Sequence, residues 1–171
     1  MLHIIPALEI MKTVTDKNIN SSHAKVRRQA FEKANELQSI TKGTMIIEGV
    51  MFDRITPRLN AQHKQAIEFL YKIDYSGKDV SDYNITSTIN FIAKREAKVD
   101  YVIILTENTS KHNPDGHKRI VSITPIDFLG KMLKFKELYD SYMDYIKLNP
   151  QAKEFRGQII DGMVTAIFFS S

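Results

Sequence analysis

The sequence predicts a single α/β domain in which a mainly parallel central sheet is flanked by helices in a three-layer arrangement. Short apolar segments alternate with helical segments of ten or more residues, which is typical of parallel strands joined by helical crossovers. Thr-Pro pairs at residues 56–57 and 124–125 each provide a helix cap followed by a first-turn proline. The 171 residues contain no repeat and no linker rich in Gly, Ser or Pro, so one domain over residues 1–171 is expected.

The first part of the chain predicts two strands with a helix between them. Residues 2–5, Leu-His-Ile-Ile, are expected to form a short buried strand that ends at Pro6. Residues 20–22, Asn-Ser-Ser, offer caps for a helix whose apolar residues recur at helical spacing until Gly43 closes it. Residues 44–52 are apolar and partly β-branched, and they are expected to form a buried strand.

The rest of the chain continues the alternation. Helices are predicted after residue 57 and before residue 97, and residues 101–105 form the clearest strand pattern in the sequence. A further strand is expected over residues 119–123, and a long helix over 125–148. That helix presents a stripe at alternating spacings of four and three residues, made of Phe128, Met132, Phe135, Tyr139, Tyr142 and Ile146.

The C-terminal residues predict a β-hairpin after the long helix. Asn149 and Pro150 end the helix, and Asp161-Gly162 suits a two-residue turn between apolar segments at 158–160 and 163–169. The hairpin is expected to extend an edge of the sheet.

Composition restricts the classes of function. The chain has 24 Lys and Arg against 20 Asp and Glu, a net charge of +4, which permits nucleic-acid partners without requiring them. The absence of cysteine excludes disulfides, thiolate zinc sites and cysteine nucleophiles. No apolar segment is long enough to span a membrane and the N-terminus does not resemble a signal peptide, so we expect a cytoplasmic protein that does not enter membranes. Phosphate-binding glycine loops, serine-hydrolase elbows and zinc-protease helices are also missing from the sequence.

Four carboxylates near predicted strand ends or helix starts are the candidate metal ligands: Glu9, Asp79, Asp82 and Glu107. Converging carboxylates bind Mg²⁺ or Mn²⁺ through hard oxygen ligands, and the ion can then activate water against a phosphodiester. The carboxyl ends of parallel strands are where such groups are expected to meet. The alternative is that each of these acids caps a helix or lies in a solvated turn.

Basic residues on two predicted helices could contact phosphates. Arg27 and Arg28 lie on the first long helix, and Lys131, Lys134 and Lys136 lie on the last. The alternative interpretation is a solvated face for the lysines. The aromatic stripe of the 125–148 helix is expected to form either the core or the surface for a protein partner or a homodimer.

Two segments resemble the PIN-domain family of metal-dependent ribonucleases, which includes many toxins of toxin–antitoxin pairs. Residues 97–106, AKVDYVIILT, are similar to that family's strand containing Asp-Tyr, and residues 119–129, RIVSITPIDFL, are similar to its closing strand and following Thr-Pro helix. Asp79 and Asp82 lie at about the distance upstream where the family keeps an acidic residue. The resemblance implies an α/β fold and a magnesium- or manganese-dependent ribonuclease.

The sequence also departs from the family pattern. Ala7 stands where the family has its first-strand aspartate, which leaves Glu9 as the nearby acid. The helix beginning at Pro57 supplies no carboxylate through residue 63, and Glu107-Asn108 follows Thr106 where an aspartate is common. If the family resemblance holds, its metal site is partly lost or rearranged in this chain.

Two functions follow from these observations. The first is a metal-dependent nuclease acting on RNA, with Asp79, Asp82 and Glu107 as catalytic carboxylates. Lys118, or its neighbour Arg119, would stabilise the charge that develops on the phosphate. The second is a non-catalytic interaction or nucleic-acid-binding accessory protein on the same fold, which accounts more directly for Ala7.

Overall fold

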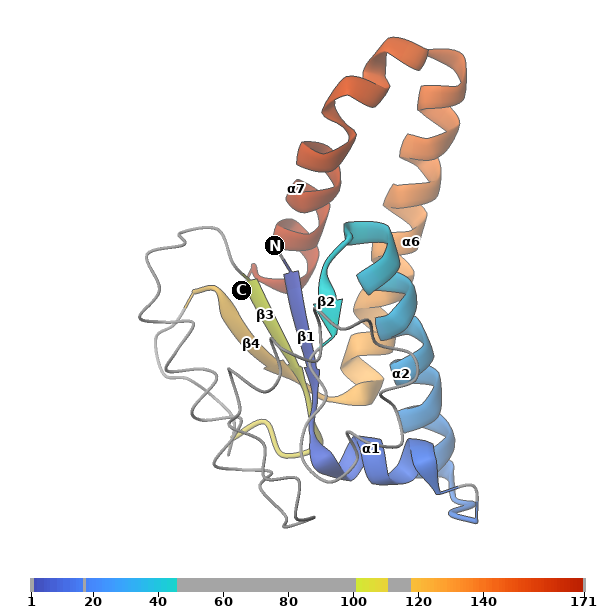
Figure 1. The fold of residues 1–171 in the computed structure, drawn as a ribbon, viewed down its shortest axis with the longest axis vertical. Helices are drawn as coiled ribbons and strands as arrows, with labels where there is room; N and C mark the ends of the chain where they lie inside the picture. The colour runs from blue at the N-terminus through green and yellow to red at the C-terminus, as the bar shows by residue number, and fades with distance from the viewer. Residues whose placement is uncertain (1, 17, 46–100, 111–117, 171) are drawn as a thin grey trace, which may run out of the picture.

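The computed structural model describes the N-terminal part of the chain and most of its last 71 residues. The description covers residues 2–16, 18–45, 101–110 and 118–170. Figure 1 shows how these segments meet: strands from the N-terminal part and from residues 101–123 form one sheet, beside which the long helices pack.

The strands in the described ranges form a sheet of four parallel strands in the order β2-β1-β3-β4. The N-terminal strand is therefore central, with neighbours on both sides, and it aligns Ile4 with Ile103 of β3. β3 in turn aligns Ile103 with Val121 of β4. The strands span Leu2–Pro6 (β1), Thr44–Met45 (β2), Tyr101–Leu105 (β3) and Ile120–Ile123 (β4).

Both faces of the two central strands are buried. Ile4 and Ile103 point into the helical core, and their neighbours Ile5 and Ile104, on the other face, are also fully buried. This explains the continuous apolar runs, which are usual for parallel strands. The α/β class with a parallel sheet and helices is confirmed. The helices predicted within residues 57–97 lie outside the described residues, so the three-layer arrangement stays a prediction.

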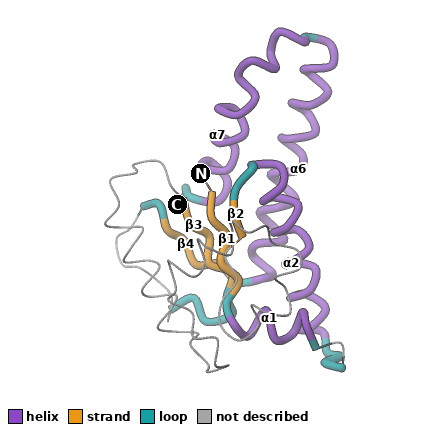
Figure 2. The backbone as a smooth tube through the Cα atoms, viewed as in Figure 1, coloured by secondary structure: helices purple, strands orange, loops and turns teal. Residues whose placement is uncertain are grey.

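Within the described residues, four α-helices and one 3-10 helix accompany the strands, and Figure 2 shows the helical segments in purple. Side-chain caps fix two of them where the sequence predicts: Ser21 Oγ accepts a hydrogen bond from the Ala24 N–H, and Thr124 Oγ1 accepts one from the Asp127 N–H. The helices span Leu8–Thr15 (α1), Ser22–Thr41 (α2), Pro125–Leu148 (α6), Pro150–Phe155 (η3) and Arg156–Phe168 (α7).

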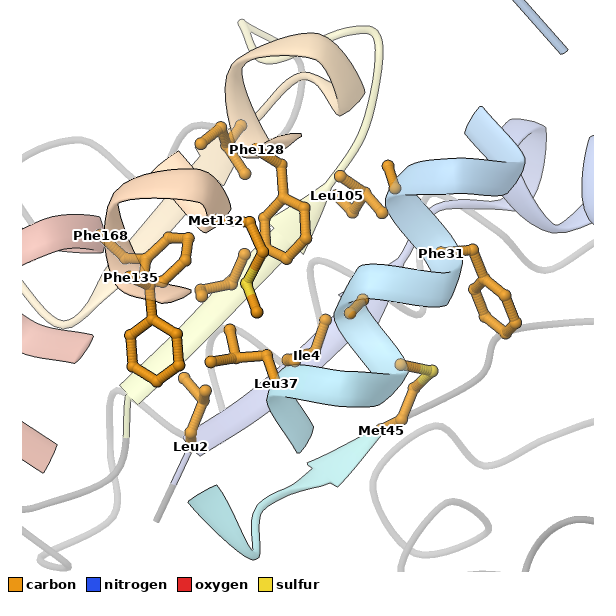
Figure 3. Close-up of a cluster of buried hydrophobic side chains, with 14 of the residues drawn as sticks. Leu2, Ile4, Phe31, Leu37, Met45, Leu105, Phe128, Met132, Phe135 and Phe168 are labelled. Carbon is orange, nitrogen blue, oxygen red and sulfur yellow. The ribbon is translucent and has the colours of Figure 1, made fainter. Parts of the chain in front are cut away.

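The aromatic stripe of α6 forms part of the core. Phe128, Met132 and Phe135 are buried against side chains of α2, α7 and the sheet (Figure 3). Phe128 stacks on Phe168 of α7 with 5.5 Å between ring centroids. Tyr142 is also buried, and its hydroxyl donates to the Ala152 carbonyl at 2.9 Å. The stripe that suggested a homodimer surface is therefore packed inside the chain.

The predicted C-terminal hairpin is wrong, because residues 156–168 form the helix α7. Its buried side chains Ile160, Val164 and Phe168 recur every four residues and lie on one face of the helix, whereas Gly162 and Ala166, which a strand would place on that same face, are exposed. Asp161 and Gly162, which suggested the turn, lie on the exposed side of the helix. Figure 1 shows α6 and α7 side by side as an antiparallel pair.

An ion-pair network joins the outer sides of α2 and α6. Lys136 Nζ lies 3.0 Å from Glu36 Oε1 and 3.6 Å from Asp140 Oδ1, and Lys33 Nζ lies 3.2 Å from Glu36 Oε2. The hydrogen bond from Lys136 lowers the pKa of Glu36, and the same bond raises the pKa of Lys136. Because α2 and α6 are distant in sequence, this network is a tertiary link.

We expect the Glu36–Lys136 pair to contribute a small, pH-dependent stabilisation. Since the pKa of Glu36 is lowered in the folded state, its share is present above about pH 4.5 and is lost as the pH falls further. The share of Lys136, whose pKa is raised, is lost only well above pH 10. Partial solvent exposure limits the coupling to about 0.2–1 kcal/mol.

A double-mutant cycle with Glu36→Gln and Lys136→Met in urea unfolding measures that coupling. It should be present at pH 7 and absent at pH 2.5. Equal coupling at the two pH values would contradict the assignment.

Candidate functional site at the carboxyl end of the sheet

The carboxyl ends of β1 and β3 bring two predicted site residues together. Ala7 follows β1 and donates its N–H to the Leu105 carbonyl at 2.9 Å, which places the start of α1 beside the end of β3. Glu9 lies in the first turn of α1, and Thr106 and Glu107 directly follow β3. Parallel strands therefore deliver these groups to one edge of the sheet, as the sequence predicts.

The carboxylate of Glu9 is held by hydrogen bonds from the segment after β3. Its Oε1 accepts from the Thr106 hydroxyl at 2.7 Å and from the Glu107 N–H at 3.0 Å. Thr106 is fully buried, and its Oγ1 also accepts from the Asn108 N–H at 3.1 Å. The hydroxyl thus acts as both donor and acceptor, which fixes the orientation of the Glu9 carboxylate.

Arg27 of α2 completes the cluster. Its Nε donates to Glu107 Oε1 at 3.2 Å, and its Nη1 donates to Thr13 Oγ1 at 3.0 Å. Thr13 is buried and donates its hydroxyl to the Glu9 backbone carbonyl at 2.9 Å. One guanidinium therefore ties α2 to α1 and to the segment after β3, in the fork geometry that distinguishes arginine from lysine.

We call these five residues, Glu9, Thr13, Arg27, Thr106 and Glu107, the edge cluster. Its formal charge is −1, because it contains two carboxylates and one guanidinium. In both Glu9 and Glu107 the hydrogen bonds involve Oε1. The other carboxylate oxygen, Oε2, accepts no hydrogen bond from the residues that the structure describes. Two carboxylate oxygens at one sheet edge are thus available to an incoming cation or hydrogen-bond donor.

The other predicted site residues are not seen in the edge cluster. Asp79 and Asp82 lie outside the described residues. Lys118 is exposed in the turn before β4, so it lies at the amino end of that parallel strand, whereas Glu9 and Glu107 follow carboxyl ends. The structure therefore does not bring Lys118 together with the two carboxylates.

Ala7 occupies a position where a longer side chain would have no room without rearrangement. It is fully buried, and its carbonyl accepts the N–H groups of Ile10 and Met11 at the start of α1. Ala7 is thus a packed part of the strand-to-helix turn. The nearest acid, Glu9, reaches the same edge from two positions further along the chain, in the first turn of α1.

The edge cluster fits a divalent cation in part. Carboxylate oxygens are the ligands that Mg²⁺ and Mn²⁺ prefer, and Glu9 and Glu107 each offer one. Within the described ranges, no three His, Cys, Asp or Glu side chains form a group that could hold a metal ion. A complete ligand set therefore needs further oxygen donors, and Asp79 and Asp82 remain the predicted ones.

Comparison with known proteins identifies no relative: the chain matched no protein-family model, no curated protein and no solved structure. No helix in the described parts of the chain is both long and apolar enough to cross a membrane.

Proposed function

We propose that this protein is a metal-dependent nuclease that hydrolyses RNA phosphodiesters at the edge cluster. The observation that carries the proposal is the hydrogen bond from the Glu107 N–H to the Glu9 carboxylate, which joins segments almost 100 residues apart. One carboxylate oxygen of each residue accepts no hydrogen bond from the described residues. Their position at the carboxyl ends of parallel strands is where α/β folds hold ligands. The resemblance of residues 97–106 and 119–129 to PIN-domain ribonucleases adds to this support.

Four residues of the edge cluster have a role in the proposal, and Thr13 links Arg27 to α1. Glu9 and Glu107 hold Mg²⁺ or Mn²⁺, together with Asp79 and Asp82. Thr106 fixes the Glu9 carboxylate so that little reorganisation is needed on binding, as outer-shell hydrogen bonds do in metal sites. Arg27 reduces the repulsion between the carboxylates and positions Glu107. When bound, the ion supplies an activated water and offsets charge on the phosphodiester.

A second candidate function is favoured by the pairing of Arg27 with Glu107. The guanidinium already neutralises one carboxylate, and Oε1 of Glu9 serves as a structural acceptor for Thr106 and Glu107. The edge cluster would then be a purely structural clamp in a non-catalytic interaction protein. Exposed apolar side chains on the outer surface of α6, Leu133 and Leu148 among them, would suit a protein partner.

Incubation of the purified protein with labelled single-stranded RNA and Mn²⁺ separates these functions. We expect cleavage that EDTA abolishes and that Glu9→Gln lowers by at least about 100-fold, since the amide removes a metal ligand yet keeps an oxygen acceptor for Thr106. Asp82→Asn should also abolish cleavage. Glu137→Gln, on an exposed position of α6, is the control with the same change in charge.

The stability of the Glu9 variants shows whether lost activity reflects lost fold. Glu9→Gln should unfold near the wild-type temperature, whereas Glu9→Ala leaves the buried Thr106 hydroxyl without its acceptor and should cost about 1–3 kcal/mol. Intact RNA under every condition would reject the nuclease and favour the structural clamp.

A further inference from the structure

A second feature of the same sheet edge is a pocket of about 520 Å³ where β4 leads into α6. Its volume lies within the range of about 300–1,000 Å³ that is usual for small-molecule sites. Thr109, two residues after Glu107, forms part of its wall. The pocket therefore adjoins the segment that carries the edge cluster without sharing its side chains.

Two lysines of α6 line this pocket, and their charges are not neutralised. Lys131 and Lys134 lie three residues apart, which makes them neighbours on the helix surface. Neither forms an ion pair with any residue that the structure describes, whereas Lys136 on the same helix pairs with Glu36. Two adjacent, unpaired ammonium groups repel each other, and an anion between them would relieve the repulsion.

The rest of the lining suits the other parts of a nucleotide. Val121 and Ile126 provide apolar surface on which a base can lie. Asp127 provides a carboxylate that can accept a hydrogen bond from a ribose hydroxyl. The two lysines and the single carboxylate leave the pocket with a formal charge of +1, which favours an anionic ligand overall.

A glycine in the pocket wall has no explanation in the packing of the chain. Gly130 lies inside α6, where glycine is less favourable than alanine by about 1 kcal/mol. A Cβ atom built at this position meets no atom within 4 Å, so no described neighbour requires the missing side chain. Because Gly130 has no side chain, a ligand in the pocket can come close to the helix backbone at this point.

We propose that this pocket binds one nucleotide unit of an RNA strand, with its phosphate between Lys131 and Lys134. The inference rests on the proposed function and deepens it, because a strand seated here continues along the loop of Thr109 toward Glu9 and Glu107. The pocket would position RNA for cleavage and takes no part in the chemical step itself.

Binding measured without metal tests the pocket separately from the nuclease activity. In EDTA, the fluorescence anisotropy of a short labelled single-stranded RNA should show about tenfold weaker binding by Lys131→Ala/Lys134→Ala than by the wild type. The magnitude of the slope of log K against log salt concentration should fall by about 0.7, since the two lysines neutralise one phosphate and each neutralised phosphate on a single strand contributes about 0.7. The matched control is Lys147→Ala/Lys153→Ala, which removes the same charge from exposed positions near η3.

A variant that leaves the net charge unchanged provides a second readout. Gly130→Ala adds a methyl group to the pocket wall and should weaken RNA binding several-fold while slightly stabilising the helix. Gly157→Ala, at another helical position with open space, should stabilise equally without affecting binding. A nucleoside monophosphate should displace the RNA at concentrations at which inorganic phosphate does not.

Three results would overturn the proposed pocket. They are no RNA binding by the wild type in EDTA, unchanged binding by both pocket variants, and equal displacement by phosphate and nucleotide. Each is independent of whether the wild type cleaves RNA in Mn²⁺, which remains the test of the proposed function.

Discussion

Replacing Phe128 with alanine is expected to destabilise the protein by about 3–5 kcal/mol. Phe128 is fully buried at the start of α6, and its ring stacks on Phe168 of α7. Truncation would remove this contact and leave a cavity where α6, α7 and the sheet meet, because Phe135 also packs against Phe168 and is held in place. For a chain of this size the loss corresponds to a fall in Tm of about 6–20 °C.

Thermal and urea unfolding of the Phe128→Ala variant would measure this loss. The control is Leu133→Ala, on the same helix at a side chain that is 69% exposed, which should change stability by less than about 0.5 kcal/mol. If Phe128→Ala unfolded within 1 kcal/mol of the wild type, the packing of α7 against α6 would be incorrect.

Gly43→Ala should produce the second large loss, of about 3 kcal/mol. Gly43 follows α2, and a Cβ built there would collide with the Leu2 carbonyl oxygen of β1. That oxygen belongs to the backbone of a strand paired on both sides, so it cannot move aside as a flexible side chain would. The cost should therefore lie at the upper end of what overpacking usually causes.

The same residue also closes α2 by hydrogen bonds. Its N–H donates to the Gln38 carbonyl at 3.0 Å, and its own carbonyl accepts the Gln38 side-chain amide at 2.8 Å. The left-handed position of the cap is taken by Lys42, with a φ of 55°. We therefore expect Lys42→Gly to stabilise the protein by up to about 1 kcal/mol while Gly43→Ala destabilises it, and urea midpoints of the two variants would show this opposite sign.

The elements that the sequence predicts well are those with one unambiguous period. α6 has a cap, a first-turn proline and a regular apolar stripe, and it begins and ends where those signals indicate. α7 was mistaken for a hairpin because Asp161-Gly162 is a strong local turn signal, whereas the buried side chains of a helix that packs on α6 set its conformation. α1 was not predicted, since Thr13, Val14 and Thr15 are β-branched and weaken its helical pattern.

The candidate site was predictable only in its position. The rule that polar groups gather at carboxyl ends of parallel strands selects Glu9 and Glu107, and the structure brings them together. The role of Arg27 was not visible, because its pairing with Glu107 joins residues 80 positions apart. In the sequence, Thr106 has the pattern of a residue that ends an apolar strand. Its hydrogen bond to Glu9 forms only because α1 follows β1 and so lies at the same edge of the sheet.

The order of strands in the sheet has a consequence for biosynthesis. β1 is synthesised before its longest partner, β3, which follows about 100 residues later in the chain. Leu2 therefore cannot pair with Tyr101 until that later segment has been synthesised. At translation rates of about 5–20 residues per second, a strand that is apolar except for His3 lacks that partner for about 5–20 s, not counting the residues still in the exit tunnel. During that interval the nascent chain presents a free strand edge, at which a chaperone or a neighbouring nascent chain could pair.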